Sequence, residues 1–347
     1  MMNTGKSLKK AALVSVGLLL AGSMLVLGSC QKKQDAASGS ATTEVAKIKA
    51  RFAGTEGDAS PQSQMLHEVA KRLNDSGKFQ IDVFTSGSLS SDTDDLVTQA
   101  LQGSNIVVPS DPGRISANQK VPDFGILMAP YVLTDYKVLD KLLATPLYQQ
   151  WEKDFEKAGL KLVTNNFYNG MRNFITNKQV NSPADLKGLR IRGFGNTIGL
   201  GLAKYLGYSQ MTIPATDIYT GVQAKTIDGC EIQTPTAYSY RLWEVLKYVN
   251  LTKHYMLTSS IVCGTQFFNS MPKDTQDLFL KTFRDVCSEY QGKVAKIEQD
   301  NQAEMATKGM VINTIDTAAF SAAVQPLYSE LGFSAGLKDR LFKELGL

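Results

Sequence analysis

The sequence contains few of the residues from which most catalytic and metal sites are built. It has only two histidines, His67 and His254, which are far apart in a chain of 347 residues. It also lacks a Gly-x-Ser-x-Gly motif, a phosphate-binding loop and a Cys-His pair at a characteristic spacing. We therefore expect no hydrolytic enzyme, no metal ion and no cofactor.

Cysteines are scarce as well. Of the four in the sequence, Cys230, Cys263 and Cys287 are widely spaced in the second half of the chain. An odd number at wide spacing fits neither a disulfide framework nor a zinc site. Two arrangements stay open for them, one bridge with a free thiol or three buried thiols.

Only one stretch of the sequence is apolar over a long distance. Residues 11–27 are apolar, follow Lys6, Lys9 and Lys10, and end in Leu-Gly-Ser before Cys30. A basic start, an apolar centre and small residues at the end are typical of a secretory signal peptide. A single transmembrane anchor is the alternative, but glycines and serines interrupt a run that is already short for a span.

The residues Leu-Gly-Ser-Cys at 27–30 resemble a bacterial lipobox, in which the cysteine receives a lipid and becomes the new N-terminus. The resemblance implies a signal peptide at 1–29 and lipidation of Cys30. Residues 31–43 are small and polar and contain no aromatic residue, which predicts a lipidated tether over 30–44. We expect a protein on the periplasmic side of a bacterial membrane, anchored there by acyl chains.

The remaining part of the chain, about 300 residues, is long enough for one large domain or two ordinary ones. The formal net charge of the whole sequence is only +4. No stripe of basic residues interleaved with aromatic ones is present, so we expect no nucleic-acid partner.

Strand-like and helix-like segments alternate after the tether, which favours α/β architecture. The patterns predict strands at 48–53, 79–84, 105–108, 160–166, 190–192 and 227–232. They also predict helices that begin near Ser60, Asp92, Gly193, Asp217 and Pro235, the last of which runs to Tyr248. From Pro272 to about Thr307, apolar residues recur at steps of three and four, which predicts one helix about 50 Å long. Such a helix is long enough to back two lobes.

Four motifs of this region resemble the solute-binding proteins of TRAP transporters, the DctP family. Residues 186–192 (LKGLRIR) resemble the family's DLKGLKIR segment, and 169–172 (NGMR) resemble its NGxR element twenty residues upstream. Residues 218–229 (IYTGVQAKTIDG) resemble VYxALQTGxVDG, and 129–135 (APYVLTD) resemble PFLFxD. The helix after Pro272 corresponds to the family's long spanning helix.

This resemblance implies a two-lobed α/β periplasmic binding protein with a cleft between the lobes, crossing strands and a long C-terminal helix spanning both lobes. The first lobe would comprise 45–169 and 258–297, and the second 170–257 and 298–347. It also implies that closure of the lobes captures a small organic, carboxylated solute without chemistry. The implied partners are the two membrane subunits of an ion-gradient-driven TRAP permease, and a helical-repeat periplasmic partner stays open.

The resemblance assigns the pairing of a ligand carboxylate to Arg192, whose guanidinium fork suits two carboxylate oxygens. Strand alternation alone cannot choose it, since Arg190 lies on the same side. Arg172, in the NGMR element, matches a second arginine that often faces the cleft; the alternative for it is an ion pair at the hinge. Asp111 and Glu56 match acidic positions of the cleft, with a turn-shaping role and a solvated loop acid as their respective alternatives.

Three positions depart from the family pattern. Ile232 stands where many relatives carry a carboxylate-binding asparagine, and Ala215 where many carry an aromatic ring. Gln233 would replace the asparagine only if its strand slipped by one residue, which would reverse the face it presents. Because the two replacements make the pocket roomier and more apolar, we expect a ligand more hydrophobic than a sugar acid or a C4-dicarboxylate.

Two other functions fit part of the same sequence. One is a sensor or scavenger lipoprotein that has no role in transport. The other is the binding lipoprotein of an ATP-driven importer, which the unbroken helix after Pro272 and the LRIR element disfavour.

Overall fold

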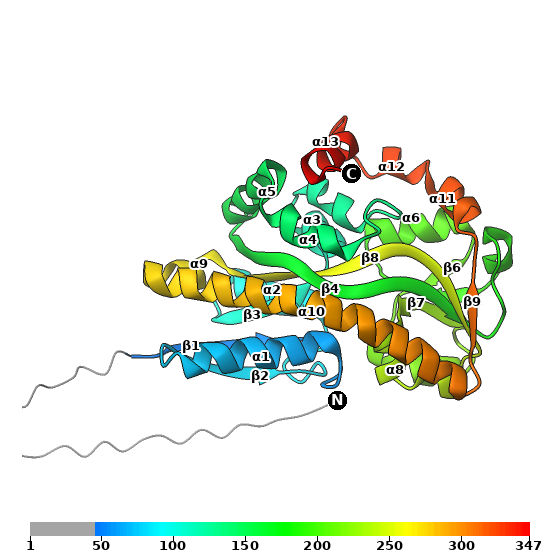
Figure 1. The fold of residues 1–347 in the computed structure, drawn as a ribbon, viewed down its shortest axis with the longest axis horizontal. Coiled ribbons are helices and arrows are strands. Elements are labelled where there is room, and N and C mark those ends of the chain that lie inside the picture. The colour runs from blue at the N-terminus through cyan, green and yellow to red at the C-terminus, as the bar shows by residue number, and fades with distance from the viewer. Residues whose placement is uncertain (1–45) are drawn as a thin grey trace, which may run out of the picture. The chain divides into compact units, whose positions relative to one another are not determined.

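The computed structural model describes residues 46–347, so the predicted signal peptide, the tether and Cys30 lie outside the described residues. The strands of the described part form a single mixed sheet in the order β2-β1-β3-β8-β4-β7-β5-β6, with β9 paired to β8 (Figure 1). They are β1 (Ile48–Ala53), β2 (Phe79–Phe84), β3 (Ile106–Ser110), β4 (Leu160–Thr176), β5 (Arg190–Arg192), β6 (Ser209–Met211), β7 (Gly229–Gln233), β8 (Tyr248–Gly264) and β9 (Val311–Thr314).

Two long antiparallel strands, β4 and β8, run through the middle of the sheet and join its two halves. The parallel strands β1, β2 and β3 extend from the C-terminal part of β8 and belong to the first lobe. The parallel strands β5, β6 and β7 extend from the C-terminal part of β4 and belong to the second lobe. The register between β4 and β8 shifts at four points between Leu162 and Phe174, and such irregularities bend a strand. The expected crossing strands are therefore confirmed.

Helices cover both halves of this sheet. They are α1 (Pro61–Asp75), α2 (Thr93–Leu101), α3 (Pro112–Asn118), α4 (Leu139–Leu143), α5 (Pro146–Lys157), α6 (Thr197–Leu206), α7 (Ile218–Gln223), α8 (Thr234–Ser239), α9 (Thr265–Asn269), α10 (Lys273–Thr307), α11 (Ala318–Val324), α12 (Leu327–Glu330) and α13 (Leu337–Leu345). The predicted start of α1 is confirmed, because the Ser60 side chain accepts a hydrogen bond from the Ser63 amide and Pro61 occupies the first turn.

The long helix α10 backs both lobes, as its length predicted. It contacts α1 of the first lobe and α8 of the second, and Figure 1 shows it running along the crossing strands. Phe279 and Phe283 belong to the first lobe's core, where the Phe283 ring centre lies 5.2 Å from that of Phe52. Met305, near the other end, belongs to a core cluster of the second lobe.

Several boundaries differ from the sequence expectations. The prediction of one helix from Pro235 to Tyr248 is wrong. Helix α8 ends at Ser239, and Arg241 has a positive φ of 56°, which interrupts helical backbone. Tyr248 begins β8. Strand β8 was not expected and β4 is longer than predicted, because both carry buried polar residues where the sheet approaches the cleft. Helix α13 packs into the first lobe's core rather than into the second lobe, to which 298–347 was expected to belong.

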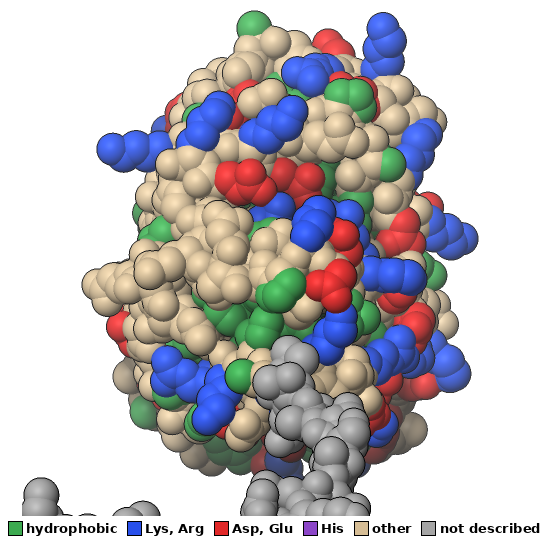
Figure 2. Space-filling view, turned by 90° about the vertical axis from the view of Figure 1, so that its left-hand side faces the viewer, with side chains coloured by type: hydrophobic (Ala, Val, Ile, Leu, Met, Phe, Trp, Pro, Cys, Tyr) green, Lys and Arg blue, Asp and Glu red, His purple; other side chains and the backbone are tan. Residues whose placement is uncertain are grey.

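The cysteines and the surface of the described part show the following features. Cys230, Cys263 and Cys287 are all buried free thiols. No helix within residues 46–347 has the length and hydrophobicity needed to cross a bilayer. On the face shown in Figure 2, basic and acidic side chains are intermixed, with hydrophobic side chains in small groups between them.

The packing of α10 generates a stability prediction. Replacing the fully buried Phe283 with alanine leaves a cavity in the first lobe's core and should lower the free energy of unfolding by about 3–5 kcal/mol. Leu200→Ala, at a half-exposed helical position, should change it by no more than about 0.5 kcal/mol. Urea denaturation checks both values, and equal losses in the two variants would contradict the assigned core.

Candidate ligand-binding site

A cavity of about 380 Å³ lies between the lobes, at the C-terminal ends of β1, β3, β5 and β7. Ligands of open α/β sheets commonly bind at such strand ends. All seven sequence-predicted ligand-binding residues line this cavity, namely Glu56, Asp111, Arg172, Arg192, Ala215, Ile232 and Gln233. The structure therefore brings together positions that are spread over almost 180 residues of sequence, about half the chain.

Arg192, at the end of β5, provides a buried positive charge in the wall of the cavity. Its Nε atom donates a hydrogen bond to the carbonyl oxygen of Ile213 at 3.0 Å, and only 9% of the residue is exposed. It makes no ion pair with any residue in the described part of the chain. Burial and the nearby Arg172 lower the pKa of Arg192, as expected for a cation without a counter-charge. Arg190, which the alternation could not distinguish from it, instead pairs with Asp228 at 2.8 Å.

Arg172, on β4, is held by the protein itself. Its Nε and Nη2 atoms donate to the two carboxylate oxygens of Glu231 at 2.5 and 2.7 Å, and its Nη1 atom donates to Gln233 Oε1 at 3.0 Å. The alternative of an ion pair at the hinge is thus the arrangement observed. Its guanidinium also lies 4.1 Å from the centre of the Phe194 ring. Arg172 reaches the cavity wall with its charge already compensated.

Glu231, which the sequence analysis missed, organises the groups beneath the cavity. Besides Arg172, the Tyr255 hydroxyl donates to Glu231 at 3.1 Å, the Phe194 amide donates at 3.2 Å, and His254 Nε2 lies 3.3 Å away. Burial alone would raise the pKa of Glu231, but the Arg172 and His254 side chains lower it to about 2. An acid inside the short buried strand GCEIQ was the available signal, since a buried charge requires a partner.

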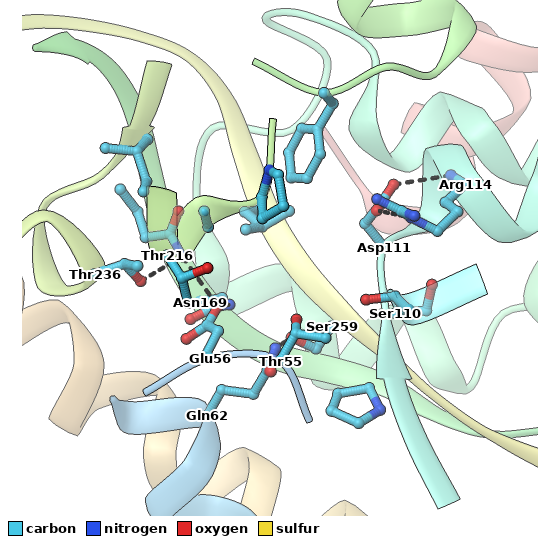
Figure 3. A pocket seen from close by; sticks show the side chains of 18 of the residues that line it. Thr55, Glu56, Gln62, Ser110, Asp111, Arg114, Asn169, Thr216, Thr236 and Ser259 are labelled. Atoms are coloured by element: carbon cyan, nitrogen blue, oxygen red, sulfur yellow. Dashed lines mark hydrogen bonds and ion pairs between the residues drawn. The ribbon is translucent and has the colours of Figure 1, made fainter. Parts of the chain in front are cut away.

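Glu56 and Asn169 form a hydrogen-bonded pair on the first-lobe side of the cavity (Figure 3). Asn169 Nδ2 donates to Glu56 Oε1 at 2.8 Å, and Gln233 Nε2 donates to the same oxygen at 3.3 Å. The other two oxygens of this pair, Glu56 Oε2 and Asn169 Oδ1, are buried without a partner in the described structure. Burial raises the pKa of Glu56, and the Asn169 hydrogen bond offsets only part of that effect.

Asp111 has the turn-shaping role that was its alternative, although it also lines the cavity. It caps α3 by accepting from the Arg114 amide at 2.8 Å and from Arg114 Nε at 3.2 Å. Asn196, the N-cap of α6 in the second lobe, also donates to it at 3.2 Å. The Asp111–Arg114 pair lies apart from Glu56 and Asn169 in Figure 3.

The three departures from the family pattern have separate outcomes. Ile232 and Ala215 line the cavity as expected and give it two apolar positions. Gln233 reaches the cavity without any slip, because β7 ends there and its amide bridges Arg172 and Glu56. Most of the other lining side chains are polar, including Thr55, Gln62, Ser110, Thr236, Thr258 and Ser259. Apolar residues such as Phe194, Ile213 and Leu257 line the cavity as well, so the hydrophobic ligand stays a prediction.

Among residues 46–347, no group of three or more His, Cys, Asp or Glu side chains is arranged to hold a metal ion.

Comparisons with known proteins identify the family of this chain. The family model described as bacterial extracellular solute-binding protein, family 7, named DctP, matches residues 52–334. The C4-dicarboxylate-binding periplasmic protein DctP of Vibrio cholerae is 24% identical over 75% of this chain and 78% of its own. The 2,3-diketo-L-gulonate-binding periplasmic protein YiaO of Escherichia coli is 25% identical over 82% of this chain and 86% of its own.

Solved structures share the architecture. A TRAP periplasmic solute-binding protein from Ochrobacterium anthropi with bound L-fuconate superposes with a TM-score of 0.81, at 25% identity over 86% of this chain and 100% of its own. Another from Desulfovibrio salexigens, in complex with diglycerolphosphate, gives a TM-score of 0.81 at 26% identity over 87% of this chain and 97% of its own. The chain therefore belongs to the DctP family, the solute-binding proteins of TRAP transporters.

Proposed function

We propose that this protein captures a small carboxylated solute in the cavity and delivers it, chemically unchanged, to a TRAP permease driven by an ion gradient. The observation that carries the proposal is Arg192, a buried guanidinium in the cavity wall that forms no ion pair within residues 46–347. L-fuconate and C4-dicarboxylates, which the names of similar proteins give as ligands, are carboxylates and support this chemistry.

The assignment of roles follows from the contacts. Arg192 binds the carboxylate, because charge-assisted hydrogen bonds to a guanidinium strengthen when closure excludes water. Arg172 and Gln233 shape the adjacent wall, and Glu56 with Asn169 faces the rest of the solute from the first lobe. A ligand that contacts both lobes favours the closed state by its differential affinity for it.

The lobes proposed to close are those of the sequence analysis, with one change. Residues 45–169 and 258–297 make up the first lobe, and 170–257 with 298 onwards make up the second, but α13 returns to the first. We also propose that Cys30 is lipidated and holds the protein at the periplasmic side of a membrane, where the permease subunits lie.

The role of Arg192 predicts a selective loss of binding. Arg192→Ala should cost about 2–5 kcal/mol of binding free energy, because the buried carboxylate loses its charged partner. Arg190→Ala is the matched control, since Arg190 pairs with Asp228 outside the cavity wall. Native mass spectrometry of the proteins after incubation with a cell extract, followed by denaturing extraction, measures the retained solute. Equal retention by wild type and Arg192→Ala would contradict the proposal.

The burial of His254 next to Glu231 predicts that the stability of the protein depends on pH. Burial lowers the pKa of His254, with only partial compensation from Glu231, so the unfolded chain takes up this proton first, near pH 6.5. The contribution of His254 to stability is therefore present above about pH 6.5 and is lost as the pH falls below that value. Between pH 7 and pH 5 the wild-type protein should lose stability, measured as a fall in its thermal unfolding temperature. This fall should be smaller in His254→Gln and unchanged in His67→Gln. Identical pH profiles for wild type and His254→Gln would refute the assignment.

The proposed anchor is tested separately. Cys30→Ser should abolish the incorporation of a radiolabelled fatty acid and shift the protein from the membrane fraction to the periplasmic fraction. Incorporation that persists in Cys30→Ser would show that the lipid is attached elsewhere or that the N-terminus is processed differently.

A further inference from the structure

The charged residues that line the cavity are divided between its two walls. Those contributed by residues 55–114 are three acids and one arginine, whereas those contributed by residues 169–236 are two arginines and no acid. Most of these charges are already paired. Glu231 neutralises Arg172, and Arg114 pairs with Asp111 at 3.2 Å, with Asp94 at 3.0 Å and with Asp92 at 3.9 Å.

Two opposite charges are left over after this pairing, and they lie on different lobes. Arg192 ends β5 in the second lobe, and Glu56 lies in the loop after β1 in the first lobe. Neither forms an ion pair within residues 46–347. Both side chains line the same cavity.

The acidic side of the cavity also presents hydrogen-bond acceptors. Asn169 Oδ1 is buried and unpartnered, and Glu56 Oε2 is buried without a hydrogen bond of ordinary length, although the Ser60 and Thr236 hydroxyls are close enough to lower the pKa of Glu56. The hydrogen bond from Asn169 Nδ2 to Glu56 holds the two side chains together. Asn169 is 1% exposed, so its oxygen has little access to water. Buried acceptors are nearly always satisfied in proteins, so this pair indicates a ligand that supplies N–H or O–H groups.

We propose that the solute is a zwitterion, with its carboxylate on Arg192 and a cationic nitrogen on Glu56 and Asn169. This inference rests on the proposed function and specifies its ligand. A plain monocarboxylate would leave Glu56 buried without a counter-charge once the cleft closes, and a dicarboxylate would bring a second negative charge to it. A hydroxyl supplies a donor but no charge, whereas an ammonium group supplies three donors and the charge.

Burial raises the pKa of Glu56 and lowers the pKa of Arg192, so each charged form would be favoured by an opposite charge on the solute. A zwitterion would also link the two lobes directly, its negative end on the second and its positive end on the first. The cavity volume of about 380 Å³ limits the solute to a small molecule.

The test uses matched ligands and the full chain purified in detergent. One series holds 4-aminobutanoate, 4-hydroxybutanoate, butanoate and succinate, and the other holds alanine, lactate, propionate and malonate. In at least one series, isothermal titration should show that the amino compound binds at least about ten-fold more tightly than each other compound of that series. A hydroxy acid or a diacid as the tightest binder would overturn the proposal.

Variants separate this inference from the proposed function. Glu56→Gln keeps the size of the side chain and should weaken binding of the amino compound by about ten-fold, with little effect on the hydroxy compound. Asp58→Asn, an exposed acid of the same loop outside the cavity wall, is the matched control and should bind like wild type. An unchanged affinity of Glu56→Gln for the amino compound would contradict the role of Glu56, and thermal unfolding without ligand verifies that the variant is folded.

The solute retained from a cell extract gives an independent answer, because its composition can be determined after denaturing extraction. We expect it to contain a basic nitrogen. A retained acid without such a nitrogen that is lost in Arg192→Ala would overturn the zwitterion and leave the proposed function standing. A protein that retains no solute and binds no member of either series counts against both.

Discussion

The ion pair between Arg172 and Glu231 sets the charge of the cleft. Three arginines line the cavity. Arg114 and Arg172 pair with carboxylates, whereas Arg192 forms no ion pair within residues 46–347. Breaking a buried pair by removing one partner is strongly destabilising, so Arg172 is not available to exchange Glu231 for a ligand. Arg192 is consequently the cation that a solute encounters. The Glu231 carboxylate also accepts from Tyr255 and Phe194, which ties the crossing strand β8 and the loop after β5 to this pair.

The sheet places these groups between the two lobes. Strands β4 and β8 cross from one half of the sheet to the other, and Asn169 and Arg172 lie among the register shifts of β4. Gly170, between them, has a φ of 115°, and a Cβ atom there would lie 2.9 Å from Gln233 Cβ. The close approach that positions Gln233 therefore requires glycine. The geometry of the wall depends on the bend in the crossing strand as much as on the side chains that line it.

Sequence reasoning located the site better than it located the strands that support it. Arg192, Glu56 and Gln233 could be placed in one cleft because family motifs fix their order along the chain, and the structure brings them together. Glu231 was missed because an acid in a short apolar segment was not followed to its partner, 59 residues away in sequence. The alternation rule expects apolar residues on the buried face of a strand. It failed on β4 and β8 because both strands bury asparagine and threonine near the cleft, and β8 also buries His254.

The chemistry of the ligand was the least predictable feature. Ile232 and Ala215 indicated an apolar pocket, and the wall also carries polar residues such as Thr258 and Ser259, on a strand that was not expected. Unpartnered atoms such as Asn169 Oδ1 are a property of three-dimensional packing and have no counterpart in a sequence pattern. A sequence motif identifies an arginine, but only the structure shows whether that arginine is already paired.

A crystal structure of the protein with the solute that it retains from a cell extract tests the central claim most directly. The account predicts closed lobes with the solute between them, its carboxylate within hydrogen-bond distance of Arg192 and Arg172 still paired with Glu231. A solute bound away from Arg192, or an Arg192 side chain paired with a protein carboxylate in the closed state, would contradict it.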